Sequence, residues 1–196
     1  MSDNLNHQES GPVELPTLES PRLKLRALSQ DDAPTIARLA GRREIADTTL
    51  SIPHPYSDQQ AKEWIERTSE SWNQKKGVVF AVVSKADGQL VGTVGLAHIE
   101  QEHSQAELGY WIAVDHWSLG YATEASEAVI RFGFEILHLN RIYAHHMLRN
   151  PASGRVLEKL GMQKEGILRE RLRKWEVFED VALYAVLKRD RPTQGT

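Results

Sequence analysis

Hydrophobic and polar residues alternate along this chain with two different periods, and the switches between them predict the order of its elements. Residues 22–28 alternate charged and apolar side chains, which is the two-residue period of a half-buried strand. Largely apolar runs at 78–83, 90–99 and 106–114 are also typical of strands, and Asp87-Gly88 is a strong hairpin signal between the first two. We therefore expect these three runs to form an antiparallel meander.

Four other segments repeat apolar residues at steps of three and four, which is the period of an amphipathic helix. The first two follow Ser29 and Ser57, each a good N-cap with aspartate in the next turn. The fourth follows Asn150, and Gly161 lies where its C-terminal cap needs a left-handed residue. The third begins after Gly120, and its predicted inner face comprises Ala122, Ala125, Val129, Phe132 and Ile136.

Further strand-like runs at 141–148, 162–171 and 177–187 complete the pattern. The predicted order is one strand, two helices, three strands, one helix, one strand, one helix and two strands. Strands that alternate with helices in this way predict a mixed α/β sheet in one domain.

Composition and charge limit the classes of function. The chain has 196 residues, of which 40% are hydrophobic and 26% charged, so it can bury a sizeable core. Residues 1–20 contain four acidic residues and no Lys or Arg, and we expect them to form a flexible acidic tail. The remainder has 23 acidic residues against 24 Lys and Arg, so the net charge of −3 comes from the tail. A nearly neutral folded part argues against nucleic acid as a partner.

Several other functions are not expected. No apolar run approaches the ~20 residues of a membrane helix, and no signal-peptide pattern is present, so we expect a cytoplasmic location and no membrane partner. The absence of cysteine excludes disulfides, thiolate metal sites and an acyl-cysteine intermediate. His145 and His146 are adjacent on a predicted strand and point to opposite faces, so we expect no metal site.

The most informative segment is 117–125, Trp-Ser-Leu-Gly-Tyr-Ala-Thr-Glu-Ala, which joins a predicted strand to a predicted helix. The first N–H groups of a helix have no partner within the helix, and its dipole favours an anion there. Gly120 and Ala122 keep side-chain bulk away from an approaching phosphate. The spacing matches neither the dinucleotide fingerprint nor a Walker loop. The two interpretations are a pyrophosphate site and an ordinary strand-to-helix turn.

Four motifs in this order resemble the GNAT (Gcn5-related N-acetyltransferase) superfamily and, within it, the RimJ/RimL-type branch. They are 52–56 (Ile-Pro-His-Pro-Tyr), 107–112 (Glu-Leu-Gly-Tyr-Trp-Ile), 117–125, and 150–161 with its Asn-x-x-Ser and Leu-Glu-Lys-Leu-Gly. The resemblance spans about 22–188 and implies a single-domain α/β GNAT fold with a mixed, mostly antiparallel central sheet flanked by helices on both faces. The predicted organisation is an N-terminal tail at 1–20, the N-acetyltransferase domain at 21–190 and a C-terminal tail at 191–196.

The resemblance implies acetyl-CoA as co-substrate, held where the family's fourth and fifth strands splay apart. The backbone expected to pair with the pantetheine arm is that of Trp111, Ile112, Ala113 and Val114, and an N–H near Ile112 would stabilise the oxyanion. The pyrophosphate would bind backbone N–H groups of Leu119, Gly120, Tyr121, Ala122 and Thr123. Asn150 would fix the pantetheine arm, a role compatible with a plain N-cap. The branch's Gly-Lys is Ser118-Leu119 here, and Trp117 replaces the usual first Gln or Arg, so one charge contact is lost.

Acetyl transfer needs a neutral amine, a stabilised oxyanion and a proton for the departing thiolate. Glu107 is the candidate base, acting directly or through water; the alternative is a structural carboxylate bonded to a neighbouring strand. Glu170 is a weaker candidate, since the aligned position is Leu172, which cannot serve. Ser153 is the candidate donor to the leaving sulfur, because the tyrosine that many family members use is Leu157 here. The alternative for Ser153 is a local backbone hydrogen bond in the first helical turn.

His54 and Tyr56 lie on the loop that family members place beside the acceptor, so we expect them to bind substrate; the alternative is a rigid surface turn. The branch resemblance implies an amine acceptor, and a protein N-terminal α-amine such as that of a ribosomal protein is the first expectation. A small-molecule amine, such as a polyamine, amino acid or aminoglycoside, is the alternative. A non-catalytic acyl-CoA-binding module is a third reading. The branch is also compatible with a homodimer.

Overall fold

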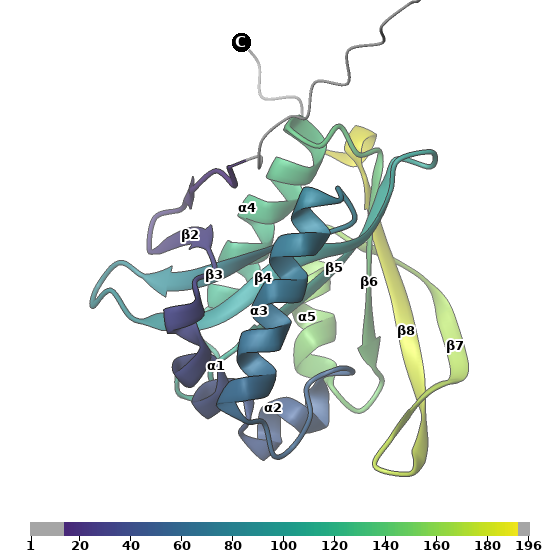
Figure 1. Cartoon of the computed structure of the whole chain (residues 1–196). Helices are drawn as coiled ribbons and strands as arrows, with labels where there is room; N and C mark the ends of the chain where they lie inside the picture. Colours follow the sequence, from purple (N-terminus) through teal and green to yellow (C-terminus); the bar gives the residue numbers. More distant parts are fainter. Residues whose placement is uncertain (1–13, 192–196) are drawn as a thin grey trace, which may run out of the picture.

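The structure, a computed structural model, describes residues 14–191, which form an eight-stranded sheet with helices on both faces (Figure 1). The strands are β1 (Leu18–Glu19), β2 (Leu23–Ala27), β3 (Val78–Ser84), β4 (Leu90–Glu100), β5 (Gln105–Ile112), β6 (Arg141–Met147), β7 (Gln163–Lys174) and β8 (Val177–Leu187). The helices are α1 (Ala33–Ala40), α2 (Arg43–Thr48), α3 (Asp58–Asn73), α4 (Tyr121–Glu135) and α5 (Pro151–Lys159). Short 3₁₀ turns lie at Gln30–Asp32, Val114–His116 and Lys188–Asp190.

The strand order is β1-β2-β3-β4-β5-β6-β8-β7, and all neighbouring pairs are antiparallel except β5 and β6. These two strands are parallel and pair only from Gln105↔Arg141 to Glu107↔Tyr143. Beyond Glu107, β5 continues to Ile112 without pairing to β6. The sheet therefore opens between its two central strands at a defined point.

The two faces of the sheet carry two separate apolar cores. On one face, Phe80, Val82 and Leu108 pack with α4 and α5. On the other, Ala81 and Trp111 pack with α1, α2 and α3. Successive residues of a strand point to opposite faces, so each strand contributes to both cores. Figure 1 shows α3 in front of the sheet and α4 and α5 behind it.

This architecture confirms the predicted α/β fold with its mostly antiparallel sheet and helices on both faces. The cap at Ser57 is also confirmed, because its hydroxyl accepts from Gln60 N at 3.2 Å and the Gln60 side chain returns a bond to Ser57 N at 2.9 Å. Gly161 follows α5 with φ of +72°, the left-handed conformation that the predicted C-terminal cap requires.

Four details differ from the prediction. The meander strand ends at Ile112, not at Val114, because a 3₁₀ turn begins there. Helix α2 was not predicted, since its six residues are too few to show a helical period. Ile136 is 61% exposed because it follows the last turn of α4. The fourth detail is strand β1, which pairs with β2 inside the predicted N-terminal tail, while residues 1–13 of that tail and 192–196 lie outside the described residues.

Candidate functional site

Two cavities meet where β5 and β6 separate. The α4–α5 cavity has a volume of about 410 Å³ and lies between the N-terminal end of α4 and the length of α5. The Glu107 cavity has a volume of about 390 Å³ and lies beside α2, the loop after it, and the open part of β5. Five residues line both cavities: Thr48, Thr49, Tyr110, Trp111 and Ser153. The two cavities thus share lining residues at the gap in the sheet.

The N-terminus of α4 forms one end of the α4–α5 cavity. Gly120 precedes the helix with φ of +81°, a left-handed conformation that glycine adopts without steric cost. Of the predicted pyrophosphate residues, Gly120, Tyr121, Ala122 and Thr123 line the cavity, whereas Leu119 does not. The exposed N–H groups of a first helical turn and the helix dipole make this end suitable for a phosphate anion.

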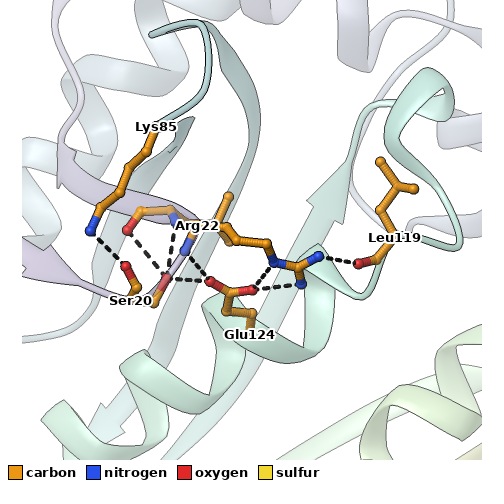
Figure 2. Close-up of polar contacts among 6 residues, drawn as sticks. Ser20, Arg22, Lys85, Leu119 and Glu124 are labelled. Carbon is orange, nitrogen blue, oxygen red and sulfur yellow. Dashed lines mark hydrogen bonds and ion pairs between the residues drawn. The ribbon is translucent and has the colours of Figure 1, made fainter.

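A polar brace fixes this loop from outside (Figure 2). Arg22, which directly precedes β2, donates Nε to Glu124 Oε2 at 2.7 Å and Nη1 to the Leu119 carbonyl at 2.9 Å. Its guanidinium also lies 4.9 Å from the centre of the Tyr121 ring. Ser20 Oγ and Arg22 N each donate to Glu124 Oε1 at 2.8 Å. Leu119 is therefore a structural anchor, because its carbonyl holds the loop while its side chain is half exposed.

The brace also fixes the charge of Glu124. Burial alone would raise the pKa of this carboxyl group, but the hydrogen bonds from Arg22 and Ser20 outweigh burial and hold its pKa below the usual value. The carboxylate therefore remains charged and keeps Arg22 beside the loop at neutral pH.

The open end of β5 presents backbone groups to the α4–α5 cavity. Ala113 N donates to Val91 O, on β4, at 2.8 Å, so the Ala113 N–H is not available to a ligand. The backbone N–H and C=O groups of successive strand residues point in opposite directions. The N–H and C=O of Ile112 therefore point away from β4, to the side where β6 has separated from β5. The Ile112 carbonyl accepts from Trp117 Nε1 at 2.7 Å, which gives a structural role to the tryptophan that replaces the usual Gln or Arg. Trp111 and Ile112 line the cavity, whereas Ala113 and Val114 do not.

Helix α5 supplies the polar groups at the junction of the cavities. Asn150 Oδ1 accepts from Ser153 N at 3.2 Å, so Asn150 is the N-cap, and it also lines the α4–α5 cavity. Ser153 Oγ lies 2.9 Å from the Tyr110 hydroxyl. This hydroxyl pair, with one member from α5 and one from β5, contrasts with the local backbone bond considered for Ser153. Burial raises the pKa of Tyr110 to about 12, so its phenol stays protonated and can donate.

Two basic side chains of α5, Arg155 and Lys159, also line the α4–α5 cavity. They lie four residues apart and therefore on one face of the helix. They supply positive charge to a cavity that lacks the lysine usual before the conserved glycine.

The carboxylate of Glu107 lies at the last residue pair before the strands part. Its Oε1 lies 3.1 Å from His145 Nδ1, on β6, and its Oε2 lies 3.8 Å from His98 Nε2, on β4. All three side chains line the Glu107 cavity. Glu107 is thus both bonded to a neighbouring strand and open to the cavity, a position compatible with the structural and with the catalytic interpretation.

The two predicted acceptor residues have different positions. Tyr56 lines the Glu107 cavity, together with Trp64. His54 does not line it, because its Nδ1 lies 2.8 Å from the Gly41 carbonyl and the ring is exposed. The weaker base candidate, Glu170, is on β7 and is absent from the lining of both cavities.

The loop beyond α2 is tied to the β7–β8 hairpin. Trp175 Nε1 donates to Asp47 Oδ1, and Lys174 Nζ donates to the Ile52 carbonyl at 3.2 Å. Lys174 is buried, and that burial lowers the pKa of its amino group. The hairpin thus supports one wall of the Glu107 cavity from outside, since the loop at 48–52 lines that wall.

Within residues 14–191, no three His, Asp or Glu side chains gather closely enough to bind a metal ion. Across this same range, no helix has the length and apolar character needed to cross a membrane.

Sequence reasoning missed three parts of this site. Tyr110 lies within the 107–112 motif, but the alternation of β5 places it on the opposite face from Glu107, and only the fold brings it to Ser153. His145 was considered only as a metal ligand. Arg22 gave no signal, because its partners Leu119 and Glu124 lie about a hundred residues away.

Comparison with known proteins agrees with this geometry. Residues 22–163 match the family model of the acetyltransferase (GNAT) domain. The chain is 33% identical over 173 residues to the uncharacterized N-acetyltransferase YoaA of Bacillus subtilis, covering 88% of this chain and 97% of the relative. It is 29% identical over 149 residues to spermidine N(1)-acetyltransferase of Vibrio cholerae, covering 76% and 83%.

Solved structures share the fold. The crystal structure of ribosomal-protein-S5-alanine acetyltransferase from Vibrio fischeri has a TM-score of 0.80 at 25% identity, covering 90% of this chain and all of that one. Mycobacterium smegmatis RimJ in complex with CoA-disulfide has a TM-score of 0.83 at 21% identity, covering 93% and 91%. The open sheet, the α4 N-terminus and these matches lead to one conclusion: the chain belongs to the GNAT family of acetyltransferases.

Proposed function

We propose that this acetyltransferase transfers the acetyl group of acetyl-CoA directly to a protein or peptide N-terminal α-amine. The observation that carries this proposal is the charge of the acceptor compartment: among the residues lining the Glu107 cavity, Glu107 is the only acidic one. A single carboxylate suits one ammonium group. A polycation such as a polyamine would need several, because each buried positive charge requires its own partner.

The acceptor's own chemistry supports the same choice. An α-amine titrates near pH 8, whereas a lysine or alkyl amine titrates near about 10.4. The α-amine is therefore partly neutral at physiological pH and needs only modest help from a base. The rest of the cavity fits an uncharged chain behind the amine, because Leu50, Ile52, Tyr56 and Trp64 line it.

The donor occupies the α4–α5 cavity in this proposal. The first turn of α4 binds the pyrophosphate, with Arg155 and Lys159 available for further phosphate charge. The Ile112 N–H, which faces the open side of β5, stabilises the oxyanion as the amine attacks the thioester carbon. Asn150 and the β5 edge orient the pantetheine arm between the two strands.

Proton transfer completes the reaction. The acceptor ammonium loses a proton toward the hydrogen-bonded side-chain pair of Glu107 and His145, and its nitrogen lone pair forms the new C–N bond. As the C–S bond breaks, the sulfur receives a hydrogen bond from the Ser153–Tyr110 hydroxyl pair, which lines both cavities. Over the whole reaction the ammonium loses two protons, one to the base and one that ends on the CoA thiol.

The second candidate is a small-molecule amine, which is favoured by the likeness to a spermidine acetyltransferase. A panel of acceptors tested with acetyl-CoA distinguishes the two hypotheses: peptides with free N-termini, spermidine and an aminoglycoside. We expect kcat/KM to be highest for the peptides and their product to carry the acetyl group on the α-nitrogen, as determined by fragmentation in a mass spectrometer. A preference for spermidine or the aminoglycoside would overturn the protein acceptor.

One double variant distinguishes a catalytic protein from a non-catalytic acyl-CoA-binding module. Glu107→Gln with Ser153→Ala should abolish most turnover and leave acetyl-CoA binding intact by calorimetry, because neither side chain belongs to the α4 phosphate end. Turnover that persists unchanged in the double variant would show that these two residues do not carry the chemistry.

A further inference from the structure

We infer that His145, not Glu107 itself, takes the proton from the acceptor amine, and that Glu107 positions and polarises the imidazole. This inference rests on the proposed function, because it assigns the base of that same site. The Glu107 carboxylate contacts one particular nitrogen of the His145 ring. Glu107 Oε1 contacts Nδ1 of His145 at 3.1 Å, so a proton on Nδ1 is donated to the carboxylate. The lone pair of the neutral ring is then on Nε2.

A carboxylate on one imidazole nitrogen fixes the tautomer and orients the ring, and it stabilises the imidazolium that forms when the other nitrogen accepts a proton. The strand register accounts for this contact. Glu107 pairs with Tyr143 in the parallel ladder, and His145 is two residues further along β6, on the same face. The strands separate beyond this pair, so the ring borders the cavity while it remains bonded to Glu107.

Basicity also favours the imidazole. An ordinary carboxyl group titrates near about 4.3 and an imidazole near about 6.5, against about 8 for an α-ammonium group. Proton transfer from the ammonium is therefore about two units less uphill to an imidazole than to a carboxylate. A general base works best when it titrates close to the operating pH.

Few charged or titratable groups near the His145 ring could compete with it for the proton. The charged and titratable neighbours of the ring are Glu107 on β5, His98 on β4 and Tyr143 on β6, whose ring stands edge-on at 5.7 Å. Glu100 on β4 acts on Tyr143. From β8, the register partner of His145 is the apolar Leu183. His146 is on the opposite face, where it packs against Tyr184.

The step balances without any further reactant. The acceptor N–H bond breaks and its proton moves to Nε2, which leaves the ring as an imidazolium beside the Glu107 carboxylate. The freed nitrogen lone pair forms the C–N bond to the acetyl carbon, the C–S bond breaks, and the second proton of the amine ends on the departing CoA thiolate. After product release the ring returns its proton to solvent.

The test compares three variants by the pH profile of kcat/KM with a free α-amine peptide. His145→Asn retains an N–H near the Nδ1 position but lacks the base, and we expect kcat/KM to fall about 100-fold or more with loss of the acid limb. Glu107→Gln retains the imidazole, so we expect a smaller loss and an acid limb moved to lower pH. His103→Asn, at an exposed turn outside both cavities, serves as the control and should match the wild type.

The opposite order of the two effects would overturn the inference: Glu107→Gln abolishing turnover while His145→Asn costs only a few-fold would make Glu107 the base. An acid limb that is unchanged in His145→Asn would overturn it as well. Failure of the proposed function looks different, because the wild-type enzyme itself would then prefer another class of acceptor. Calorimetric binding of acetyl-CoA and the circular dichroism spectrum, both expected to be unchanged, exclude a folding defect as the cause of lost activity.

Discussion

At the scale of single residues, the hydroxyl pair of Ser153 and Tyr110 is the most specific feature of the site. The two groups come from different elements, lie 2.9 Å apart and line both cavities. Because burial raises the pKa of Tyr110 to about 12, the phenol remains a proton donor throughout the pH range of acetyl transfer. The pair can therefore donate toward sulfur without a charge of its own.

This arrangement predicts that Tyr110→Phe and Ser153→Ala each lower kcat about tenfold and change the acetyl-CoA dissociation constant little. The expected size reflects one lost hydrogen bond to a developing negative charge, about 1.5 kcal/mol. Steady-state kinetics and calorimetry measure the two quantities separately. The double variant should lose little more than either single variant, since the two hydroxyls act through one bond. Fully additive losses would show that each contacts the substrate independently.

At the scale of elements, the brace formed by Arg22 fixes the loop before α4, where the proposed function places the pyrophosphate of the donor. Arg22 holds both the Leu119 carbonyl and Glu124, one on each side of the glycine that begins the helix. A second arginine, on β2 itself, offers a natural comparison. Arg26 forms a bidentate pair with Asp32 at 2.7 and 2.8 Å, but that pair holds the turn before α1, away from the α4 loop.

Arg22→Lys should therefore raise the KM for acetyl-CoA about fivefold with little change in kcat, because an amine cannot hold the carbonyl and the carboxylate in the same planar geometry. Arg26→Lys is the matched control. It should reduce the thermal midpoint at least as much as Arg22→Lys, because its partner Asp32 is buried, and leave that KM unchanged. An equal rise of the acetyl-CoA KM in both variants would reduce the brace to a general contribution to stability.

At the scale of the whole molecule, the β7–β8 hairpin reaches back to the segment after α2 and supports the wall of the Glu107 cavity that residues 48–52 form. Its turn is tied there through Trp175 to Asp47 and through Lys174 to the Ile52 carbonyl. Arg149 adds a bond from Nη2 to the Asp47 carbonyl at 2.7 Å. These contacts join the last strands of the chain to its first helices around the Glu107 cavity.

Trp175→Ala should loosen this wall and raise the KM for the acceptor several-fold, while the KM for acetyl-CoA stays constant. Phe178→Ala on the same hairpin is the control, because Phe178 is a 60% exposed aromatic side chain that packs under Arg173 rather than against α2. Initial-rate kinetics with each substrate varied in turn distinguish the two effects. A change in the acetyl-CoA KM alone would place the influence of the hairpin on the donor side.

Features of the molecule that depend on local spacing can be predicted from the sequence, and contacts between distant segments cannot. Periodicity and capping signals predict the sheet, four of the helices and the α4 N-terminus, because these depend on local spacing. Helix α2 is too short to show a period. The pairing of Glu107 with His145, 38 residues away, depends on where the parallel ladder of β5 and β6 ends. The latch of Trp175 on Asp47 spans 128 residues and likewise exists only in the fold.

In the proposed reaction, the two cavities bring an acetyl thioester and a free α-amine together at Ser153. The most direct test measures release of CoA thiol from acetyl-CoA in the presence of one peptide, with its N-terminus either free or already acetylated. The enzyme has no cysteine, so it contributes no thiol of its own. We predict release with the free peptide and none above background with the blocked one. Equal release with both peptides would show hydrolysis rather than transfer, and no release with the free peptide, despite acetyl-CoA binding, would contradict the α-amine acceptor.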